Sequence, residues 1–582
     1  MLRTLLLLCL AGLFTTIAAQ SAKISPDLRS ELAATNQVQA IVVLTRQPGA
    51  DLVKAARDRA NRGSFVYASL RDLAQRTQAG MLRQLTAEQR EFRSFTIVNA
   101  IYLLRADAEL LERLAARPEV ARIIANPWTE QDLGRVERAY GAARSTVEWG
   151  VARIGAPELW NLGFRGEGMT VGGQDTGYDW QHPALRAAYR GTQADTVIHD
   201  YNWHDAIHML NPLNNGGTNS CGFDSPQPCD DGSHGTHTMG TMVGDDGAGN
   251  QVGVAPGARW IGCRNMERGY GSPASYIECF DWFLAPTRVD GTDPDPTRRP
   301  DVIANSWSCP PLEGCNPDNF ALMQLAIENL RAAGTVVVTS AGNSGPACST
   351  IDTPPSIFAA AFPVGATNDQ DSIAGFSSRG PITIDGSGRL APQVAAPGVN
   401  VRSSVTGGGY ANFSGTSMAG PHVAGAVAVL LSALPELRGR VNDTEAIFKD
   451  SALPLFSAQN CGNFPGSVSP NAVYGHGRID LVSAYERGQT VLSITGRAAA
   501  ALVAVRAYPN PTTGLLTLEW TEERPPVALR VLDLSGREVR RQTPGNTPYR
   551  VQFSLAGLPA GVYTWQLRFM DGNMGVGRVV LR

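Results

Sequence analysis

An acid, an imidazole and a hydroxyl stand beside apolar or small-residue runs at widely separated points of this 582-residue chain: Asp175, His234 and Ser417. Side chains of these types that meet in one cleft form a nucleophilic relay. The histidine takes the serine proton, and the carboxylate holds the histidine in one tautomer. Taken alone, each has a structural explanation, as a turn former, a packed histidine or a helix N-cap. Their surroundings, taken together, predict the relay.

Ser417 precedes the run VAGAVAVLL, residues 423–431, which has no polar face and predicts a helix surrounded by protein. Proline fits the first turn of a helix, so Pro421 predicts that this helix begins near Ser417. The start of a helix offers a positive local field and backbone N–H groups that have no helical partner. Such a place suits an oxygen that carries or contacts negative charge.

The elements that would position these residues lie in a Gly-rich region, residues 148–490, where apolar strands alternate with helical runs. This alternation predicts an α/β domain with a parallel sheet and helices on both of its faces. Ligands of such sheets bind beyond the carboxyl ends of the strands, so polar residues at the strand ends are the first candidates for function. The predicted strands are 168–177, 301–307 and 334–343, with a helix over 320–334.

Residues 20–140 predict a small α+β domain ahead of this region, with strands at 39–45, 95–106 and 119–126 separated by helical runs. The first 140 residues carry 19 Lys and Arg against 14 Asp and Glu, a balance of +5. Because the whole chain has a net charge of −3, the remainder carries −8. Opposite charges favour contact between the two parts.

Residues 499–582 predict a C-terminal β-sandwich, because short alternating strands are separated there by Gly, Pro and Asn turns. The segment 493–504 is either a linker or the start of the first strand.

The chain begins with Arg3, an apolar core and the small residues Ala18 and Ala19, which together predict a secretory signal peptide over residues 1–19. No later segment is expected to span a bilayer. The small net charge gives no electrostatic basis for nucleic-acid binding.

Removal of the leader with Cys9 leaves eight cysteines, an even number that predicts disulfides in an exported protein. Eight cysteines allow 105 pairings. The closest pairs in sequence are Cys221 with Cys229 and Cys309 with Cys315. Zinc binding is the alternative, but the chain lacks a CxxC spacing.

Four motifs follow one another in the central domain: DTG (175–177), HGTH (234–237), SAGN (340–343) and GTSMAGPHVAG (415–425). Together they resemble the subtilisin-like serine peptidases, the subtilase or S8 family. The resemblance implies a serine endopeptidase (EC class 3.4.21) of subtilisin-like fold that acts on polypeptides and needs no cofactor for catalysis. It implies that Asp175, His234 and Ser417 form a catalytic triad. It also implies that the side chain of Asn343 binds the oxyanion.

The segment ANSWS (304–308) resembles the family strand that pairs with substrate backbone, which makes Ser306, Trp307 and Ser308 the candidate substrate-binding residues. Its NSW sequence resembles the bacillopeptidase F-like branch of the family. That branch usually has Gly after the Trp, where this chain has Ser308. A side chain at this position is expected to narrow or re-angle the groove.

Structural calcium is left open by the sequence, and no metal ligand is assigned. The family often has an aspartate where this chain has Ala184, and an alanine methyl cannot bind a hard cation. The acidic loops 245–250 and 368–372 could hold calcium elsewhere, although such turns are more often solvated. The resemblance implies packed roles, not metal binding, for His182, His237 and His422.

Residues 20–140 resemble the inhibitor I9-like propeptide of subtilases, which would assist folding and block the cleft until it is cut off. A permanent small domain is the alternative. We expect the cut between residues 127 and 150, where RVERAYGAARS (135–145) is expected to form an exposed basic linker.

Residues 499–582, with AYPNPTTG and LPAGVY, resemble a type IX secretion C-terminal sorting domain. The resemblance implies the type IX secretion machinery as a partner and export across two membranes, to a secreted or surface-attached location. A carbohydrate- or protein-binding sandwich is the alternative.

We therefore expect a secreted serine endopeptidase that is made as a zymogen and works as a monomer. A catalytically silent surface adhesin on a subtilase scaffold is the alternative from another class. A missing triad member would favour the adhesin, and none is missing. A lipase or esterase would have GxSxG, whereas the second residue after Ser417 is Ala419.

Overall fold

The computed structural model describes residues 23–56, 61–131, 135–139, 146–214, 218–499, 503–521, 525–533, 537–544, 549–569 and 574–582. The predicted signal peptide, residues 1–19, lies outside them. The chain divides into two compact units, with the boundary between Arg487 and Gly488.

A seven-stranded sheet forms the centre of the first unit, in the order β17-β16-β15-β14-β8-β11-β9. Every neighbouring pair in it is parallel, as predicted. The strands are short and almost wholly buried, which is typical of a parallel sheet covered on both faces. They are β8 (Thr170–Asp175), β9 (Trp203–Asp205), β11 (Arg259–Arg264), β14 (Val302–Asn305), β15 (Val336–Ser340), β16 (Phe362–Thr367) and β17 (Val394–Pro397).

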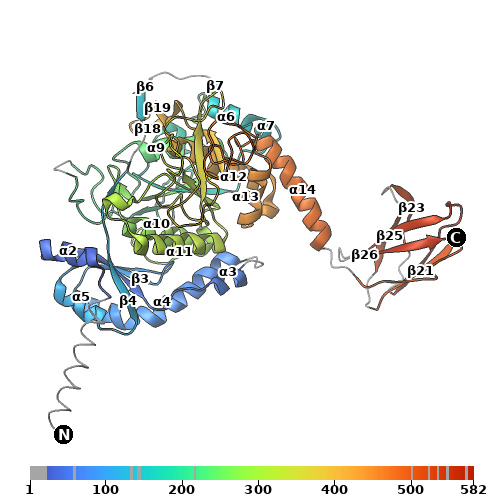
Figure 1. The fold of residues 1–582 in the computed structure, drawn as a ribbon, viewed down its shortest axis with the longest axis horizontal. Helices are drawn as coiled ribbons and strands as arrows, with labels where there is room; N and C mark the ends of the chain where they lie inside the picture. The colour runs from blue at the N-terminus through green and yellow to red at the C-terminus, as the bar shows by residue number, and fades with distance from the viewer. Residues whose placement is uncertain are drawn as a thin grey trace, which may run out of the picture. The chain divides into compact units, whose positions relative to one another are not determined.

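Two pairs of helices cover this sheet (Figure 1). Helices α9 (His234–Val243) and α12 (Thr416–Ala433) contact one another, and α12 lies along β14, β15 and β16. Helices α10 (Pro273–Leu284) and α11 (Pro317–Ala333) pack together and against β8, β11 and β15. The observed α11 confirms the helix predicted over 320–334.

Helix α12 corrects one expectation about the membrane. The sequence predicted that no segment after the signal peptide is long and apolar enough to span a bilayer. By length and apolar composition alone, α12 could nevertheless cross one. However, 89% of it is buried inside the protein. It is therefore the core helix that its lack of a polar face predicted.

The N-terminal domain is an antiparallel sheet, ordered β2-β3-β1-β4, with helices packed on it. The stretch predicted as one strand over 95–106 is a hairpin, because a turn at 96–99 separates β2 from β3. The elements are α2 (Pro26–Ala34), β1 (Val38–Leu44), α3 (Ala50–Ala56), α4 (Arg62–Ala87), β2 (Phe92–Phe95), β3 (Ala100–Ala106), α5 (Ala108–Ala115) and β4 (Val120–Ala125).

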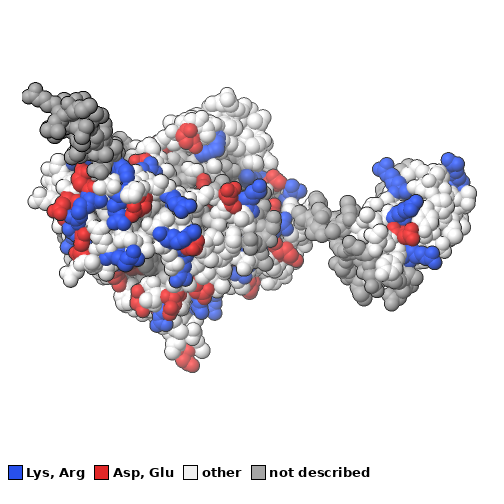
Figure 2. Space-filling view, turned by 90° about the horizontal axis from the view of Figure 1, so that it is seen from below, with Lys and Arg blue, Asp and Glu red and all other residues white. Residues whose placement is uncertain are grey.

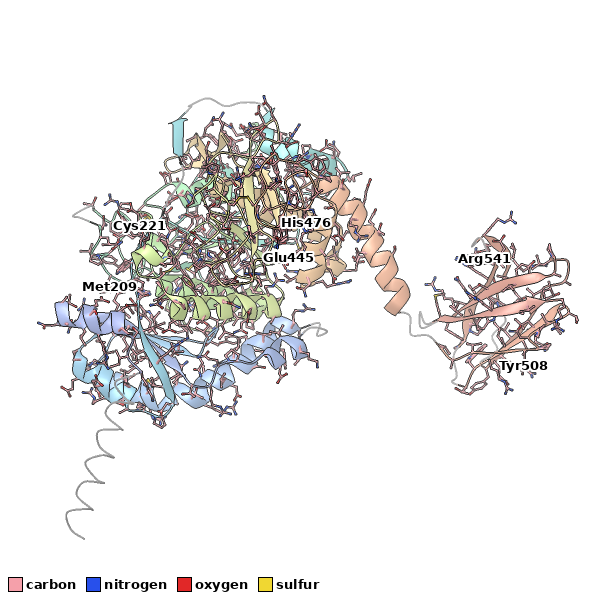
Figure 3. All side chains as sticks on the ribbon, viewed as in Figure 1. Met209, Cys221, Glu445, His476, Tyr508 and Arg541 are labelled. Carbon is pink, nitrogen blue, oxygen red and sulfur yellow. A yellow bond between two sulfur atoms is a disulfide. The ribbon has the colours of Figure 1, made fainter. Side chains whose placement is uncertain are left out.

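This domain packs on α10 and α11 (Figure 1), and one apolar cluster runs through both parts. Ile97 of the hairpin turn and Phe280 of α10 both belong to that cluster. Arg93 pairs with Asp224 at 3.2 Å, and Arg122 pairs with Asp318. Both ion pairs join a basic residue of the N-terminal domain to an acidic residue of the body, as the charge balance predicted. The thioether of Met209, labelled in Figure 3, contacts Gln39 across the same junction.

Further short strands and helices complete the first unit. Residues 135–139, predicted as part of an exposed linker, form β6 instead, while 140–145 lie outside the described residues. These elements are β5 (Thr129–Glu130), β6 (Arg135–Ala139), β7 (Thr146–Val147), α6 (Trp149–Arg153), α7 (Ala156–Asn161), α8 (Pro183–Arg186), β10 (Asn250–Gln251), β12 (Met266–Glu267), β13 (Tyr270–Gly271), β18 (Val401–Val405), β19 (Gly409–Ser414) and α13 (Val441–Asp450).

The second unit contains two antiparallel sheets, β20-β21-β24 and β23-β22-β25-β26, around a separate apolar core. This confirms the predicted β-sandwich. The segment 493–499 is not a strand, because it forms the end of helix α14 (Leu481–Ala499), which crosses the boundary between the two units. The strands are β20 (Arg506–Tyr508), β21 (Leu515–Glu519), β22 (Pro526–Leu532), β23 (Glu538–Gln542), β24 (Arg550–Ser554), β25 (Gly561–Phe569) and β26 (Met574–Leu581).

Four disulfides join the eight cysteines of the body, and both predicted pairs are among them. The four are Cys221–Cys229, Cys263–Cys279, Cys309–Cys315 and Cys348–Cys461. On the face shown in Figure 2, basic and acidic side chains of the described residues are intermixed, in keeping with the small net charge.

Candidate active site

Asp175 and His234 meet at the carboxyl edge of the sheet, where β8 ends and α9 begins. The Asp175 Oδ1 atom lies 2.7 Å from His234 Nδ1, and both side chains are almost completely buried. The carboxylate also accepts bonds from the Thr176 N–H at 2.8 Å and the Thr238 hydroxyl at 3.3 Å. Because a carboxylate only accepts, this contact places a proton on Nδ1 and makes Nε2 the basic nitrogen.

The turn before His234 is held by Asp230, which sequence reasoning did not single out. Its carboxylate accepts bonds from the N–H groups of Gly232, Ser233 and Thr236. A carboxylate just ahead of a run of small helical residues is a helix-start signal that the sequence does contain. Asp230 therefore fixes the position at which α9, and with it the imidazole, begins.

Gly235 lets this helix approach β8. A Cβ atom at Gly235 would lie 2.1 Å from the carbonyl oxygen of Gly177 and 3.0 Å from the Cβ of Asp175. Any side chain would therefore push α9 away from the strand that carries the carboxylate.

Ser417 is the second residue of α12 and is 2% exposed. This confirms the predicted start of the helix, but Pro421 lies at its sixth position, beyond the first turn. Proline has no N–H for the carbonyl four residues earlier, which is that of Ser417. The Ser306 hydroxyl donates to this carbonyl at 3.4 Å instead, so the helix continues through the proline.

Asn343 is oriented by Thr416, the residue next to Ser417. Its Oδ1 atom accepts bonds from the Thr416 N–H at 2.9 Å and the Thr416 hydroxyl at 2.8 Å. The oxygen end of the amide is thus fixed by α12, and the NH2 group is the donor end of the side chain. Thr416 was not predicted as a positioning residue, although it stands inside the GTSMAGPHVAG motif.

The three predicted substrate-binding residues follow β14 at the same edge, and they differ in environment. Ser306 contacts the backbone of Ser417, as described above. The Trp307 side chain is buried and stacks on Tyr276, with ring centroids 3.9 Å apart. Ser308 is partly exposed, and its main chain faces Gln131. The Trp307 indole is thus a core group, and a substrate would contact the main chain of this segment.

The remaining motif histidines are packed, as predicted. His237 Nε2 lies 3.0 Å from the Val401 carbonyl and 3.1 Å from that of Ala411, and its ring stacks on Phe413. Burial lowers the pKa of His237 to about 3 and that of His422 to about 4. Both rings therefore stay neutral at physiological pH. His182 caps α8, where its Nδ1 accepts from the Ala184 N–H at 3.1 Å.

In each of the two acidic loops considered for calcium, a carboxylate is engaged by protein groups. Asp371 is paired with Arg153 at 2.6 Å and with Arg478 at 2.8 Å. Asp246 accepts bonds from the N–H groups of its own loop and from the Tyr410 hydroxyl. Within the part of the chain that the structure describes, no group of three or more His, Cys, Asp or Glu is arranged to hold a metal ion.

The end of the N-terminal domain lies against both sides of this edge. On one side, β5 pairs antiparallel with β13, and the Gln131 N–H donates to the Gly269 carbonyl at 2.8 Å. On the other side, β6 pairs antiparallel with β19, where Arg135 lies opposite Ser414. Ser414 precedes Ser417 by three residues. Residues 132–134, which connect the two sides, lie outside the described residues.

Comparison with known proteins identifies the family. The model described as "Subtilase family" matches residues 166–477, more than half of the chain. The chain belongs to the subtilase family, a family of serine endopeptidases. This match falls inside the predicted domain 148–490, whose exact limits stay a prediction.

Named relatives within the subtilases agree with the predicted branch. The chain is 33% identical to Bacillopeptidase F of Bacillus subtilis (strain 168) over 494 residues, which are 82% of this chain and 31% of that protein. It is 27% identical to Subtilisin E of the same organism over 366 residues, 62% of this chain and 78% of the relative. It is 29% identical to the Thermostable alkaline protease of Halalkalibacterium halodurans over 305 residues, 51% of this chain and 68% of the relative. The chain thus spans less than a third of the length of Bacillopeptidase F.

The C-terminal unit matches a second family. The model described as "Secretion system C-terminal sorting domain" covers residues 506–580. A chain with this type IX sorting domain is exported and is either secreted or held at the cell surface. The match overturns the alternative of an accessory binding sandwich.

Proposed function

We propose that this subtilase hydrolyses peptide bonds through an acyl-enzyme intermediate, with Ser417 as nucleophile, His234 as general base and acid, and Asp175 as the group that orients His234. The observation that carries the proposal is the buried contact of 2.7 Å between Asp175 and His234 Nδ1. A buried carboxylate at that nitrogen stabilises the imidazolium that forms when Nε2 accepts the serine proton. The contact between α9 and α12 supports the approach of His234 to Ser417.

The reaction begins when the Ser417 hydroxyl attacks the scissile carbonyl carbon while His234 Nε2 takes its proton. The carbonyl oxygen becomes an oxyanion, which accepts bonds from the Asn343 NH2 group and from the Ser417 N–H at the start of α12. His234 then gives its proton to the leaving amine, and the C–N bond breaks. A water molecule activated by His234 hydrolyses the ester and restores Ser417.

Substrates in this proposal are polypeptides held in extended form. The pairing of β5 with β13 supports this, since a short strand adds to the edge of the body there through main-chain bonds. The pairing of β6 with β19, the strand that leads to Ser417, supports a second edge of this kind.

The N-terminal domain acts as an inhibitory propeptide in the same proposal. It contributes β5 and β6 to the two edges that an extended substrate would use. The bond that Ser417 cuts then lies between Gln131 and Arg135, which narrows the predicted interval of 127–150. Until this bond is cut and the domain leaves, substrate has no access to the edges.

The proposal is tested with Ser417→Ala in the full chain. Casein hydrolysis should fall by about 10⁶, the magnitude known for loss of the nucleophile in subtilisin. Labelling by a fluorophosphonate should disappear as well. Ser432→Ala, which removes a hydroxyl from the far end of the same helix, should keep both activities. Casein cleavage by the Ser417→Ala chain would refute the assignment.

A further inference from the structure

The side chain of Gln131 makes a two-point contact with the main chain of Ser308. Its Oε1 atom accepts from the Ser308 N–H and, at 3.0 Å, from the Ser308 hydroxyl. Its Nε2 atom donates to the Ser308 carbonyl at 2.7 Å. The orientation of the amide follows from its partners, because a backbone N–H only donates and a carbonyl only accepts. Gln131 is 7% exposed, so these bonds are shielded from water.

Tyr276 and Thr129 complete the surroundings of this amide. Gln131 Nε2 also donates to the Tyr276 hydroxyl at 3.0 Å, and the Thr129 hydroxyl lies 2.9 Å from the same oxygen. Tyr276 is fully buried, and its ring is held by stacking on Trp307. Burial raises the pKa of Tyr276 far above its usual range, so the phenol stays neutral.

The main chain of Ser308 is satisfied by this side chain, not by the neighbouring main chain. The Glu130 N–H donates to Glu313 Oε2 at 3.0 Å, in the loop that the Cys309–Cys315 disulfide closes. The side-chain amide of Gln131, the next residue, then supplies a donor for the Ser308 carbonyl and an acceptor for the Ser308 N–H. Gln131 thereby takes the place of a strand residue opposite Ser308.

Ser308 and Tyr276 belong to the catalytic body and stay with it when the N-terminal domain leaves. We infer that they form a subsite that selects glutamine in peptide substrates, at the position that Gln131 takes. This inference rests on the proposed function. In the N-terminal domain, Glu130 pairs with Tyr270 of β13 and Gln131 is the next residue. The selected residue of a substrate is therefore the one that follows the residue paired with Tyr270.

The subsite distinguishes a primary amide from side chains of similar length. Methionine fills the same space but leaves the Ser308 N–H without a partner and leaves the Ser308 carbonyl only long contacts of 3.5 Å with the hydroxyls of Tyr276 and Thr129. Glutamate can accept from the N–H, but its second oxygen faces the Ser308 carbonyl. A site whose buried polar groups are built to bond a polar side chain discriminates strongly against analogues that leave those groups unpaired.

The test uses internally quenched peptides with the sequence of residues 127–137 and the enzyme that the full chain produces by its own processing. The peptide with Gln at position 131 should be cut with a kcat/KM at least tenfold above that of the Gln→Met and Gln→Glu peptides. A matched control peptide carries Glu→Gln at position 130, which changes charge one residue away. It should be cut within a factor of about three of the parent peptide.

Enzyme variants locate the selectivity. Tyr276→Phe keeps the ring that stacks on Trp307 and removes the hydroxyl, so the Gln-to-Met ratio should fall at least threefold. Tyr201→Phe makes the same change beneath Arg298, away from the groove, and should leave the ratio unaltered. An enzyme that hydrolyses casein but cuts the Gln peptide no faster than the Met peptide overturns the inference and leaves the proposed function standing. Casein cleavage that survives Ser417→Ala refutes the proposed function itself.

Discussion

Polar side chains at the carboxyl edge of the sheet are oriented by hydrogen bonds to neighbours in the same domain. Polar side chains on α10 and α11, in contrast, bind the N-terminal domain. At the edge, Asp175 is fixed by Thr176 and Thr238, and Asn343 by Thr416. On the docking face, Asp281 accepts bonds from the N–H groups of Thr96 and Ile97 at 3.0 and 2.5 Å. Groups at the carboxyl edge should therefore control turnover, while groups on the docking face should control how long the N-terminal domain stays bound.

The largest loss of turnover in this set is expected for Asn343→Ala at the carboxyl edge. In the proposed mechanism the Asn343 amide donates to the oxyanion, so kcat should fall by about 10²–10³, the loss known for the corresponding donor in subtilisin. KM should change less than threefold, because the ground-state carbonyl gains little from this donor. Steady-state kinetics on a peptide substrate measures both constants. An unchanged kcat would reject the role of Asn343.

Asp281→Ala tests the role of the docking face on α10 and α11. Two N–H groups of the hairpin turn would lose their acceptor, which costs about 1–3 kcal/mol and should speed release of the cleaved N-terminal domain about tenfold or more. The measurement is the lag before casein hydrolysis begins after processing. The turnover number after release should equal that of the unaltered enzyme.

Asp281→Asn serves as the matched control, since it keeps an acceptor oxygen at the same place. It should restore most of the lag. A turnover number that falls along with the lag would show that the docking face also affects catalysis.

The smallest expected effect concerns His422, which belongs to neither region. Its pKa is lowered by burial to about 4, below the ordinary value of 6.5. As pH falls below 6.5, this histidine is therefore protonated in the unfolded chain before it is protonated in the folded chain. The free energy of unfolding that is present above pH 6.5 is lost progressively towards pH 4. His422→Asn, which keeps an amide near the position of Nδ1, should reduce the loss between pH 7.5 and 5.5 by about 1 kcal/mol.

Urea unfolding of chains that also carry Ser417→Ala measures this difference without self-digestion. Equal pH dependence with and without His422 would contradict a buried neutral ring. Turnover of the active His422→Asn enzyme, measured separately at pH 7.5, shows whether the site edge is disturbed.

The sequence predicted helix α12 and three strands of the central sheet, β8, β14 and β15, because their signals are local, but it did not single out β9, β11, β16 or β17. Buried parallel strands are continuous apolar runs, and α12 has no polar face, so neither depends on knowledge of a partner. The contact between Asp175 and His234 was predicted from an acid at a strand end and a histidine ahead of a helical run, together with the resemblance to subtilases. The disulfide pairs closest in sequence were predicted for the same local reason.

Two of the missed features, the hairpin turn and the role of Gln131, depend on contacts with another part of the chain. The turn at 96–99 contains Ile97 and Val98, which are apolar because they are buried against the body, so the hairpin looked like one continuous strand. The helix α14 extends into an Ala-rich segment whose helix propensity was outweighed by its position between domains. Gln131 gave no signal at all, since only the backbone of Ser308 opposite it reveals what its amide does.

The most direct test of the account is the N-terminal sequence of the protein that the full chain produces, compared with that of the Ser417→Ala chain. If Ser417 cuts the segment held between β13 and β19, the active chain yields a new N-terminus within residues 132–135. The Ser417→Ala chain should keep the N-terminal domain attached. The same cut in the Ser417→Ala chain, or a first cut beyond residue 139, would contradict the account.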